Sequence, residues 1–143
     1  MKKLLFFAAA LFAAVSFSAC SDDDNFDAGS IVGTWQYVRE VGYEISHGER
    51  EDYDETINHQ MLYTFNENGS GKLSEYGSDD NTFTWSMSGG NQLTISFTDE
   101  IDRARTYTIV KLTSSEMQLF YHIKALDEHG REFEQKFTMY FTR

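Results

Sequence analysis

Apolar and polar residues alternate with a period of two along most of the chain after residue 31. Segment 92–98 reads Gln-Leu-Thr-Ile-Ser-Phe-Thr, and segment 82–88 reads Thr-Phe-Thr-Trp-Ser-Met-Ser. Alternation of this kind, rich in β-branched and aromatic residues, is typical of half-buried antiparallel strands. Between the two segments lies Ser88-Gly89-Gly90-Asn91, whose glycines favour a tight hairpin turn. The pattern therefore predicts an all-β domain.

The same alternation predicts eight strands, at residues 34–45, 59–65, 71–76, 82–87, 92–98, 104–112, 116–125 and 131–142. No interval between them is long enough for a crossover helix, so we expect an antiparallel up-and-down meander. Eight such strands can close into a barrel, which removes the exposed edges of an open sheet. The alternative fold is a two-sheet sandwich, which needs a Greek-key crossing that the even spacing does not suggest. The longest connection has 13 residues, Ser46 to Asn58, and is expected to be a lid or binding loop.

Three short motifs carry a resemblance to a known family. Gly33-Thr34-Trp35, at the start of the first strand, is similar to the Gly-x-Trp signature of lipocalins. The pattern Phe65-x-x-x-Gly69-x-Gly71 and the segment 112–117 resemble the lipocalin-like domains of short bacterial lipoproteins. The resemblance covers residues 31–143 and implies a lipocalin-like barrel with one closed end. It also implies a closed-end signature of Gly33, Trp35 and Arg143, with the Arg143 guanidinium across the Trp35 ring.

The interior of such a barrel would be wide, apolar and rich in aromatic rings. Two interpretations are open: a cavity for a small hydrophobic molecule, or a barrel packed solid by the same rings, since eight strands leave just enough room for side chains. The rings nearest the open end are the expected ligand contacts, and they are Tyr63, Phe83, Phe97, Tyr107, Tyr121 and Phe133.

The N-terminal segment predicts export and lipid attachment. Two lysines precede an apolar run over residues 4–17, which is too short to span a bilayer and typical of a signal peptide. Phe17-Ser18-Ala19-Cys20 resembles the lipobox of bacterial lipoproteins, which implies a diacylglycerol on Cys20 and attachment to a membrane. The acidic residues 22–24 resemble the export tag of surface lipoproteins in Gram-negative bacteria. We expect a signal peptide at 1–19, a lipidated cysteine and acidic tether at 20–30, and a barrel at 31–143 on the outer face of the outer membrane.

The charge balance excludes one class of partner and suggests others. Twelve Lys and Arg stand against 23 Asp and Glu, a net charge of -11, which excludes nucleic-acid binding through phosphate neutralisation. An acidic rim at the open end would favour neutral or cationic ligands over fatty acids, or a basic protein partner. The rim is expected to comprise Glu49, Glu51, Asp52, Asp54, Glu55, Asp79, Asp80, Asp99, Glu100, Asp102, Asp127 and Glu128.

No motif predicts catalysis. The four histidines have no zinc-binding spacing, no Gly-x-Ser-x-Gly elbow occurs, and the single cysteine is assigned to lipid. We expect no enzyme activity, no metal and no cofactor. The sequence favours a lipid-anchored binding protein for a small hydrophobic molecule at the cell surface. The alternative is an accessory or structural surface lipoprotein with a filled barrel that contacts another protein.

Overall fold

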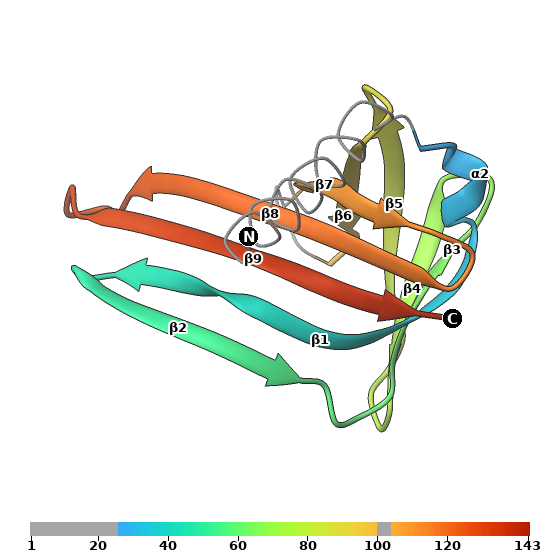
Figure 1. Cartoon of the computed structure of the whole chain (residues 1–143), viewed down its shortest axis with the longest axis horizontal. Coiled ribbons are helices and arrows are strands. Elements are labelled where there is room, and N and C mark those ends of the chain that lie inside the picture. The colour runs from blue at the N-terminus through green and yellow to red at the C-terminus, as the bar shows by residue number, and fades with distance from the viewer. Residues whose placement is uncertain (1–25, 100–103) are drawn as a thin grey trace, which may run out of the picture.

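The computed structural model describes residues 26–99 and 104–143, which form a short helix and a single antiparallel sheet (Figure 1). The helix begins at Asp27, whose Oδ1 accepts a hydrogen bond of 2.9 Å from the Gly29 amide. The elements are α2 (Ala28–Ile31), β1 (Gly33–Ser46), β2 (Glu49–Thr56), β3 (Met61–Phe65), β4 (Ser70–Glu75), β5 (Asn81–Ser88), β6 (Gln92–Phe97), β7 (Ala104–Leu112), β8 (Glu116–Leu126) and β9 (Glu132–Thr142).

The sheet closes on itself through its longest strands. The strand order is β2-β1-β3-β4-β5-β6-β7-β8-β9, and β1 also pairs with β9. Strands β1 and β3 to β9 therefore form a closed ring of eight antiparallel strands. This confirms the predicted eight-stranded up-and-down barrel, and the sandwich alternative is wrong. Both boundaries of the first predicted strand lie within one residue of those of β1. The boundaries of the other seven predicted strands lie within two residues of those of β3 to β9.

The interval expected to be a lid loop is instead mostly a ninth strand. Strand β2 pairs with the second half of β1, from Arg39↔Thr56 to Ser46↔Glu49. The two strands are joined by His47 and Gly48, which have φ angles of 57° and 81°. Positive φ at both central residues is the geometry of a tight hairpin turn, and it leaves no long loop to cover the barrel. The prediction of a lid over residues 46–58 was therefore wrong.

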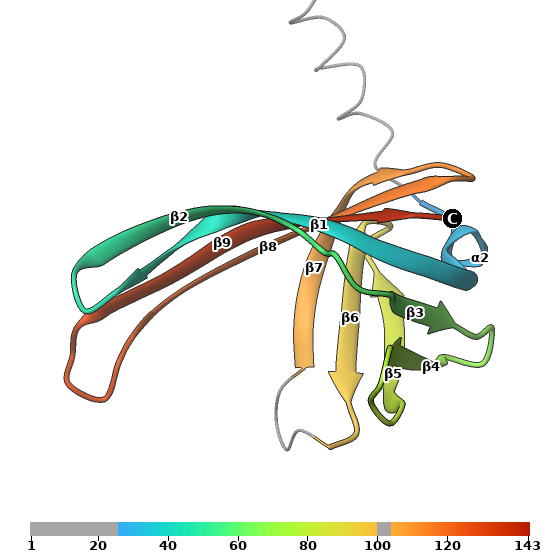
Figure 2. The same ribbon diagram turned by 90° about the horizontal axis from the view of Figure 1, so that it is seen from below.

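Strands β8, β9, β1 and β2 continue past the barrel as a four-stranded extension (Figure 2). We define it as residues 43–46 of β1, all of β2, residues 122–126 of β8 and residues 132–136 of β9. Strand β1 changes partner along one edge, from β3 at residues 33–36 to β2 at residues 39–46. Strand β7 pairs with β8 only as far as Phe120. The outer half of β8 is thereby freed from the barrel wall and extends beside β9.

The barrel core is a continuous cluster of aromatic and aliphatic side chains. Trp35 is fully buried near the closed end, and Ile31 of α2 is buried with it. Gly71 allows a close approach, because a Cβ atom there would lie 2.2 Å from the Phe83 ring. Ile123 shares the inner face of β8 with Tyr121 but is 39% exposed, because it lies on the extension, beyond the ring of eight strands.

Candidate functional site

The closed end joins the two ends of the described chain. The Arg143 guanidinium carbon lies 4.0 Å from the centroid of the Trp35 ring, so the expected stacking contact is present. Arg143 also donates hydrogen bonds to the carbonyl oxygens of Ser114, Val32 and Ser30, at 2.8, 3.0 and 3.2 Å. The buried Trp35 Nε1 donates to the Ile31 carbonyl at 2.8 Å. These bonds seal the closed end and place any ligand entrance at the opposite end of the barrel.

Five of the six expected ligand contacts form two groups of adjoining rings inside the barrel. Tyr63 lies 6.1 Å from Phe83, and Phe83 lies 5.4 Å from Phe97, measured between ring centroids. Tyr107 lies 5.5 Å from Tyr121 in the same way. Of these, Tyr63, Phe83 and Tyr107 are buried, and Phe97 and Tyr121 are half-buried against the core.

The sixth residue, Phe133, is not brought into this set. It pairs with Ala125 across β8 and β9, far along the extension, and is only half-buried. Phe133 lies on the inner face of β9, as the alternation predicts. However, β9 extends beyond the barrel, and Phe133 lies on the part that extends. Alternation gives the face of a strand on which a side chain lies and not its height along the barrel.

A polar cluster that sequence reasoning missed adjoins the rings at the open end. A β-bulge in β1 between Tyr37 and Arg39 shifts the alternation, so that Glu40 takes the inner position opposite the buried Met139. The Tyr37 hydroxyl donates a short hydrogen bond to Glu40 Oε2, and Tyr53 of β2 also hydrogen-bonds Glu40. The pKa values of both tyrosines are raised, first by burial and further by this carboxylate.

Strict alternation would have placed Arg39 inside the barrel and Glu40 outside. The bulge has no distinct mark in the sequence, which is why Glu40 was missed. The one available signal was Gly42, since a Cβ atom there would lie 2.2 Å from the Lys136 carbonyl oxygen. A glycine among inward positions marks close approach of two strands, and it would have fixed the register beyond the bulge.

The acidic rim differs from the expected ring of loops. Five of its members lie in β2, and alternation divides them between two faces. Asp52 and Asp54 on the outer face form ion pairs with Arg50 and Arg39, with N···O distances of 2.8 and 2.6 Å. Glu49, Glu51 and Glu55 share the inner face with Glu40, Glu44 and Tyr53. The inner wall of the β1–β2 hairpin therefore carries the negative charge.

The remaining rim residues follow turns, and several are paired. Asp80 lies 3.0 Å from Lys72 Nζ, and Asp127 lies 2.8 Å from Arg131 Nε. Two backbone amides and the guanidinium of Arg131 hold the pKa of the Asp127 carboxyl below its usual value. Glu100 and Asp102 lie outside the described residues.

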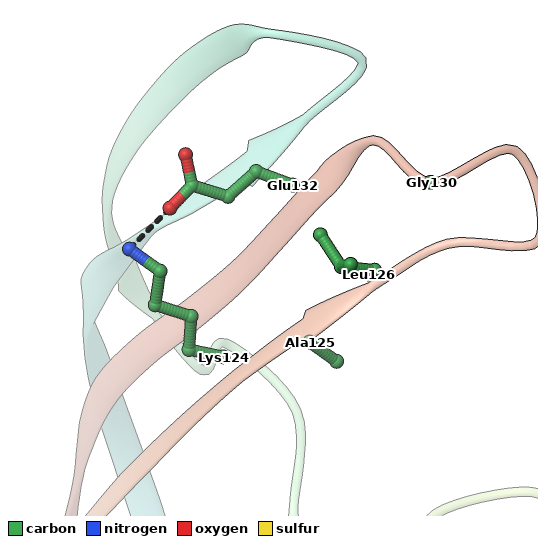
Figure 3. A pocket seen from close by; sticks show the side chains of 5 residues that line it. All are labelled: Lys124, Ala125, Leu126, Gly130 and Glu132. Atoms are coloured by element: carbon green, nitrogen blue, oxygen red, sulfur yellow. Dashed lines mark ion pairs between the residues drawn. The ribbon is translucent and has the colours of Figure 1, made fainter.

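Two open pockets, each of about 440 Å³, lie at the tips of the extension. One is bounded by the β8–β9 hairpin, where Lys124 forms an ion pair with Glu132 (Figure 3). The other is bounded by the β1–β2 turn, around His47 and Arg50. Neither includes any of the six expected ligand contacts.

The described part of the chain has neither a cluster of metal-binding side chains nor a membrane-spanning helix. Within residues 26–99 and 104–143, no three His, Cys, Asp or Glu side chains come together in a way that could hold a metal ion. In the same ranges, no helix is long and apolar enough to cross a membrane. Cys20, the expected lipidation site, lies outside these ranges.

Of the comparisons with known proteins, the match to a protein family agrees with the barrel geometry. No curated protein matches the sequence. Among solved structures, apocrustacyanin C2 is similar, with 14% identity and a TM-score of 0.48, over 86% of this chain. The chain spans 63% of the length of that protein. A family model described as a lipocalin-like domain matches residues 31–119, which is more than half of the chain. The chain belongs to the lipocalin-like domain family.

Proposed function

We propose that this protein is a lipid-anchored lipoprotein of the outer membrane, exposed on the cell surface, whose barrel binds a small hydrophobic molecule. Binding, and not catalysis, is the proposed activity. The observation that carries it is a difference in exposure among the rings. Phe83 is 1% exposed, whereas its cross-strand partner Phe97, and Tyr121 of β8, are only half-buried. Apolar rings left partly open beside polar groups are typical of ligand sites.

The packing of the barrel indicates where a ligand would sit. Trp35, Phe65 and Phe141 fill the part next to the closed end, each at 2% exposure or less. A ligand would therefore lie at the open end, over Phe97 and Tyr121, with the rings of Tyr63, Phe83 and Tyr107 beneath it. Phe133 would contact only a ligand long enough to reach the extension.

The charge on the inner wall supports neutral or cationic ligands over anions. Glu44, Glu51 and Glu55 share this wall, and none of them takes part in the ion pairs formed among the described residues. An anion entering between the extension and the barrel would be repelled by these carboxylates, and salt would weaken the repulsion.

The proposal is tested with two fluorescent probes that share one skeleton, neutral N-phenyl-1-naphthylamine and its anionic sulfonate. Each is titrated into the protein at low and at physiological salt. We expect the neutral probe to bind more tightly, with the difference narrowing as salt rises. Paired substitution of Phe97 and Tyr121 by Ala should weaken binding several-fold. Leu126→Ala should not, since that side chain is 72% exposed on the extension. Tighter binding of the anion at low salt, or no binding of either probe, would refute the proposal.

A second candidate function is an accessory or structural lipoprotein that contacts another surface protein. The extension favours it, because a projecting sheet with acidic residues on one face offers a wall for a basic partner. A photo-crosslinking residue at Glu51, on the inner wall, should then capture one defined protein in intact cells. A matched crosslinker at Asn68, on the closed-end turn between β3 and β4, should not capture it.

A further inference from the structure

Glu40 occupies an unusual position for a carboxylate. It lies on the inner face of the barrel wall, opposite Met139, with its neighbours on that face being Tyr37 and Gly42. Its side chain is partly buried, and none of the ion pairs formed among the described residues includes it. Its hydrogen bonds come from the hydroxyls of Tyr37 and Tyr53. Two tyrosine donors leave about two of the four lone-pair sites of a carboxylate open.

The negative charge of Glu40 acts across the interior. It contributes to the raised pKa values of Tyr63 on β3 and Tyr107 on β7, after the larger effect of burial. The Arg105 guanidinium hydrogen-bonds Tyr107 and acts on the same two hydroxyls with the opposite sign. Glu40 thus faces the rings from the β1 side of the interior, and Arg105 faces them from β7.

Tyr63 supplies a second, independent observation. Its ring is 8% exposed and is held by Tyr37 and Phe141, at centroid distances of 6.3 and 5.3 Å. The contact with Tyr37, whose hydroxyl donates to Glu40, brings the Tyr63 ring next to the partner of this carboxylate. A group that enters the barrel and reaches Glu40 would therefore also meet Tyr63.

We propose that Glu40 and Tyr63 form the head-group site of the ligand, and that the head group is a protonated amine carried on an apolar body. An ammonium would donate hydrogen bonds to the Glu40 carboxylate and to the Tyr63 hydroxyl oxygen. The apolar body would lie over Phe97 and Tyr121. An ammonium that reached the face of a neighbouring tyrosine ring would gain further attraction. This inference rests on the proposed binding function and names its ligand class.

A neutral alcohol of the same length is the appropriate comparison. It could donate one hydrogen bond to the Glu40 carboxylate, but it carries no positive charge that the carboxylate would attract. The ammonium and the carboxylate are opposite charges in a partly buried position, so we expect the amine to bind about tenfold more tightly than the alcohol.

The experiment is displacement of bound N-phenyl-1-naphthylamine at pH 7 by decylamine, decanol and decanoate. We expect decylamine to compete best and decanoate worst. Glu40→Gln should reduce the preference for amine over alcohol to within about twofold, because the amide keeps its acceptor oxygen and loses its charge. Tyr63→Phe should weaken the binding of decylamine several-fold. Glu44→Gln is the matched control, since it removes one carboxylate from the same face of the same strand.

The outcomes separate this inference from the proposed function. If the probe binds but decylamine competes no better than decanol, the head-group site is refuted and the binding function stands. If Glu40→Gln and Glu44→Gln lose the preference for decylamine over decanol equally, the head-group site is also refuted. The negative charge of the whole inner wall would then be enough to explain the preference. If Glu40→Gln does not fold, the ratio of decylamine affinity to decanol affinity is compared between Tyr63→Phe and the wild type. An equal ratio in the two proteins would refute the head-group site. Failure of the probe itself to bind would refute the proposed function.

Discussion

Arg143 shows how much a single terminal side chain can contribute to a small barrel. It stacks on Trp35 and donates to three carbonyl groups from different parts of the chain. Arg143→Ala should lower the free energy of unfolding by about 2 to 4 kcal/mol, from the lost stacking and the three hydrogen bonds. The free energy of unfolding of Arg143→Lys should lie between those of the wild type and Arg143→Ala, because lysine keeps the charge but lacks the planar guanidinium group. Urea denaturation measures both.

A second arginine provides the control for this prediction. Arg39 lies 5.5 Å from the Tyr140 ring and pairs with Asp54, but its side chain is 47% exposed. Exposed pairs contribute little, so Arg39→Ala should cost under about 1 kcal/mol. Unfolding midpoints that are equal for Arg143→Ala and the wild type would contradict the stabilising role.

At the scale of elements, the outer face of the extension is joined by one polar group. Glu134 of β9 accepts hydrogen bonds from His122 of β8, at 2.7 Å, and from the Tyr43 hydroxyl of β1, at 3.0 Å. Arg50 of β2 lies over the Tyr43 ring, with its guanidinium carbon 3.8 Å from the centroid. Three strands thereby meet at one carboxylate, which is 13% exposed, and β2 joins them through the Tyr43 ring.

The hydrogen bonds from His122 and Tyr43 lower the pKa of Glu134. A carboxyl whose pKa is lower in the folded state stabilises the fold above its ordinary pKa, and this contribution is lost as pH falls through the lowered value. Glu134→Gln should therefore melt at a lower temperature than the wild type at pH 7. The difference should shrink as pH falls below 4.5, the ordinary value.

Thermal unfolding between pH 7 and pH 3 measures this difference. Tyr43→Phe removes one of the two donors and is the matched variant, so it should reproduce part of the effect. A difference between Glu134→Gln and the wild type that stays constant down to pH 3 would show that the lowered pKa does not stabilise the extension.

Strand β2 shows where prediction from sequence failed. Its sequence, Glu-Arg-Glu-Asp-Tyr-Asp-Glu-Thr, has Tyr53 as its only apolar residue, and seven of its eight positions are exposed. Alternation reports burial of one face, and a strand outside the barrel buries neither. The charges suit a sheet edge, where they discourage pairing with other chains. The only available signal was His47-Gly48, which took the place of the more familiar Asn-Gly turn.

Across the whole molecule, the barrel and its closed end could be predicted because burial dictates them. Apolar and polar residues alternate in each barrel strand. The contact between Trp35 and Arg143 follows because the first and last strands, β1 and β9, meet at the closed end. The open end was predicted less well. Phe133 was assigned the wrong height and Glu40 was missed, because the length of β9 and the bulge in β1 are set by pairing between distant strands. Neither has a local pattern that one sequence displays.

Cys20→Ala tests the predicted anchor of the whole molecule. The thiol is the only one in the chain, so its loss should release the protein from membranes while the barrel still folds. Detergent fractionation of cells, followed by circular dichroism of the released protein, measures both effects. Ser21→Ala is the neighbouring control and should remain with the membrane. A Cys20→Ala variant that still requires detergent would show that lipid on this residue is not the attachment.

The closed end also determines how the molecule would respond to tension. The Phe26 amide donates to the Gly90 carbonyl at 2.7 Å, and Arg143 bonds the carbonyls of Ser30 and Val32. A pull from the N-terminal side is therefore shared with the β5–β6 turn and the last residue before it reaches β1. Strand β1 has hydrogen-bonded neighbours on both edges, so the load acts on many bonds in parallel and does not unzip them singly. Forced unfolding follows the unfolding rate, so this geometry should act as a mechanical clamp that slows unfolding when the N-terminal side of the domain is pulled.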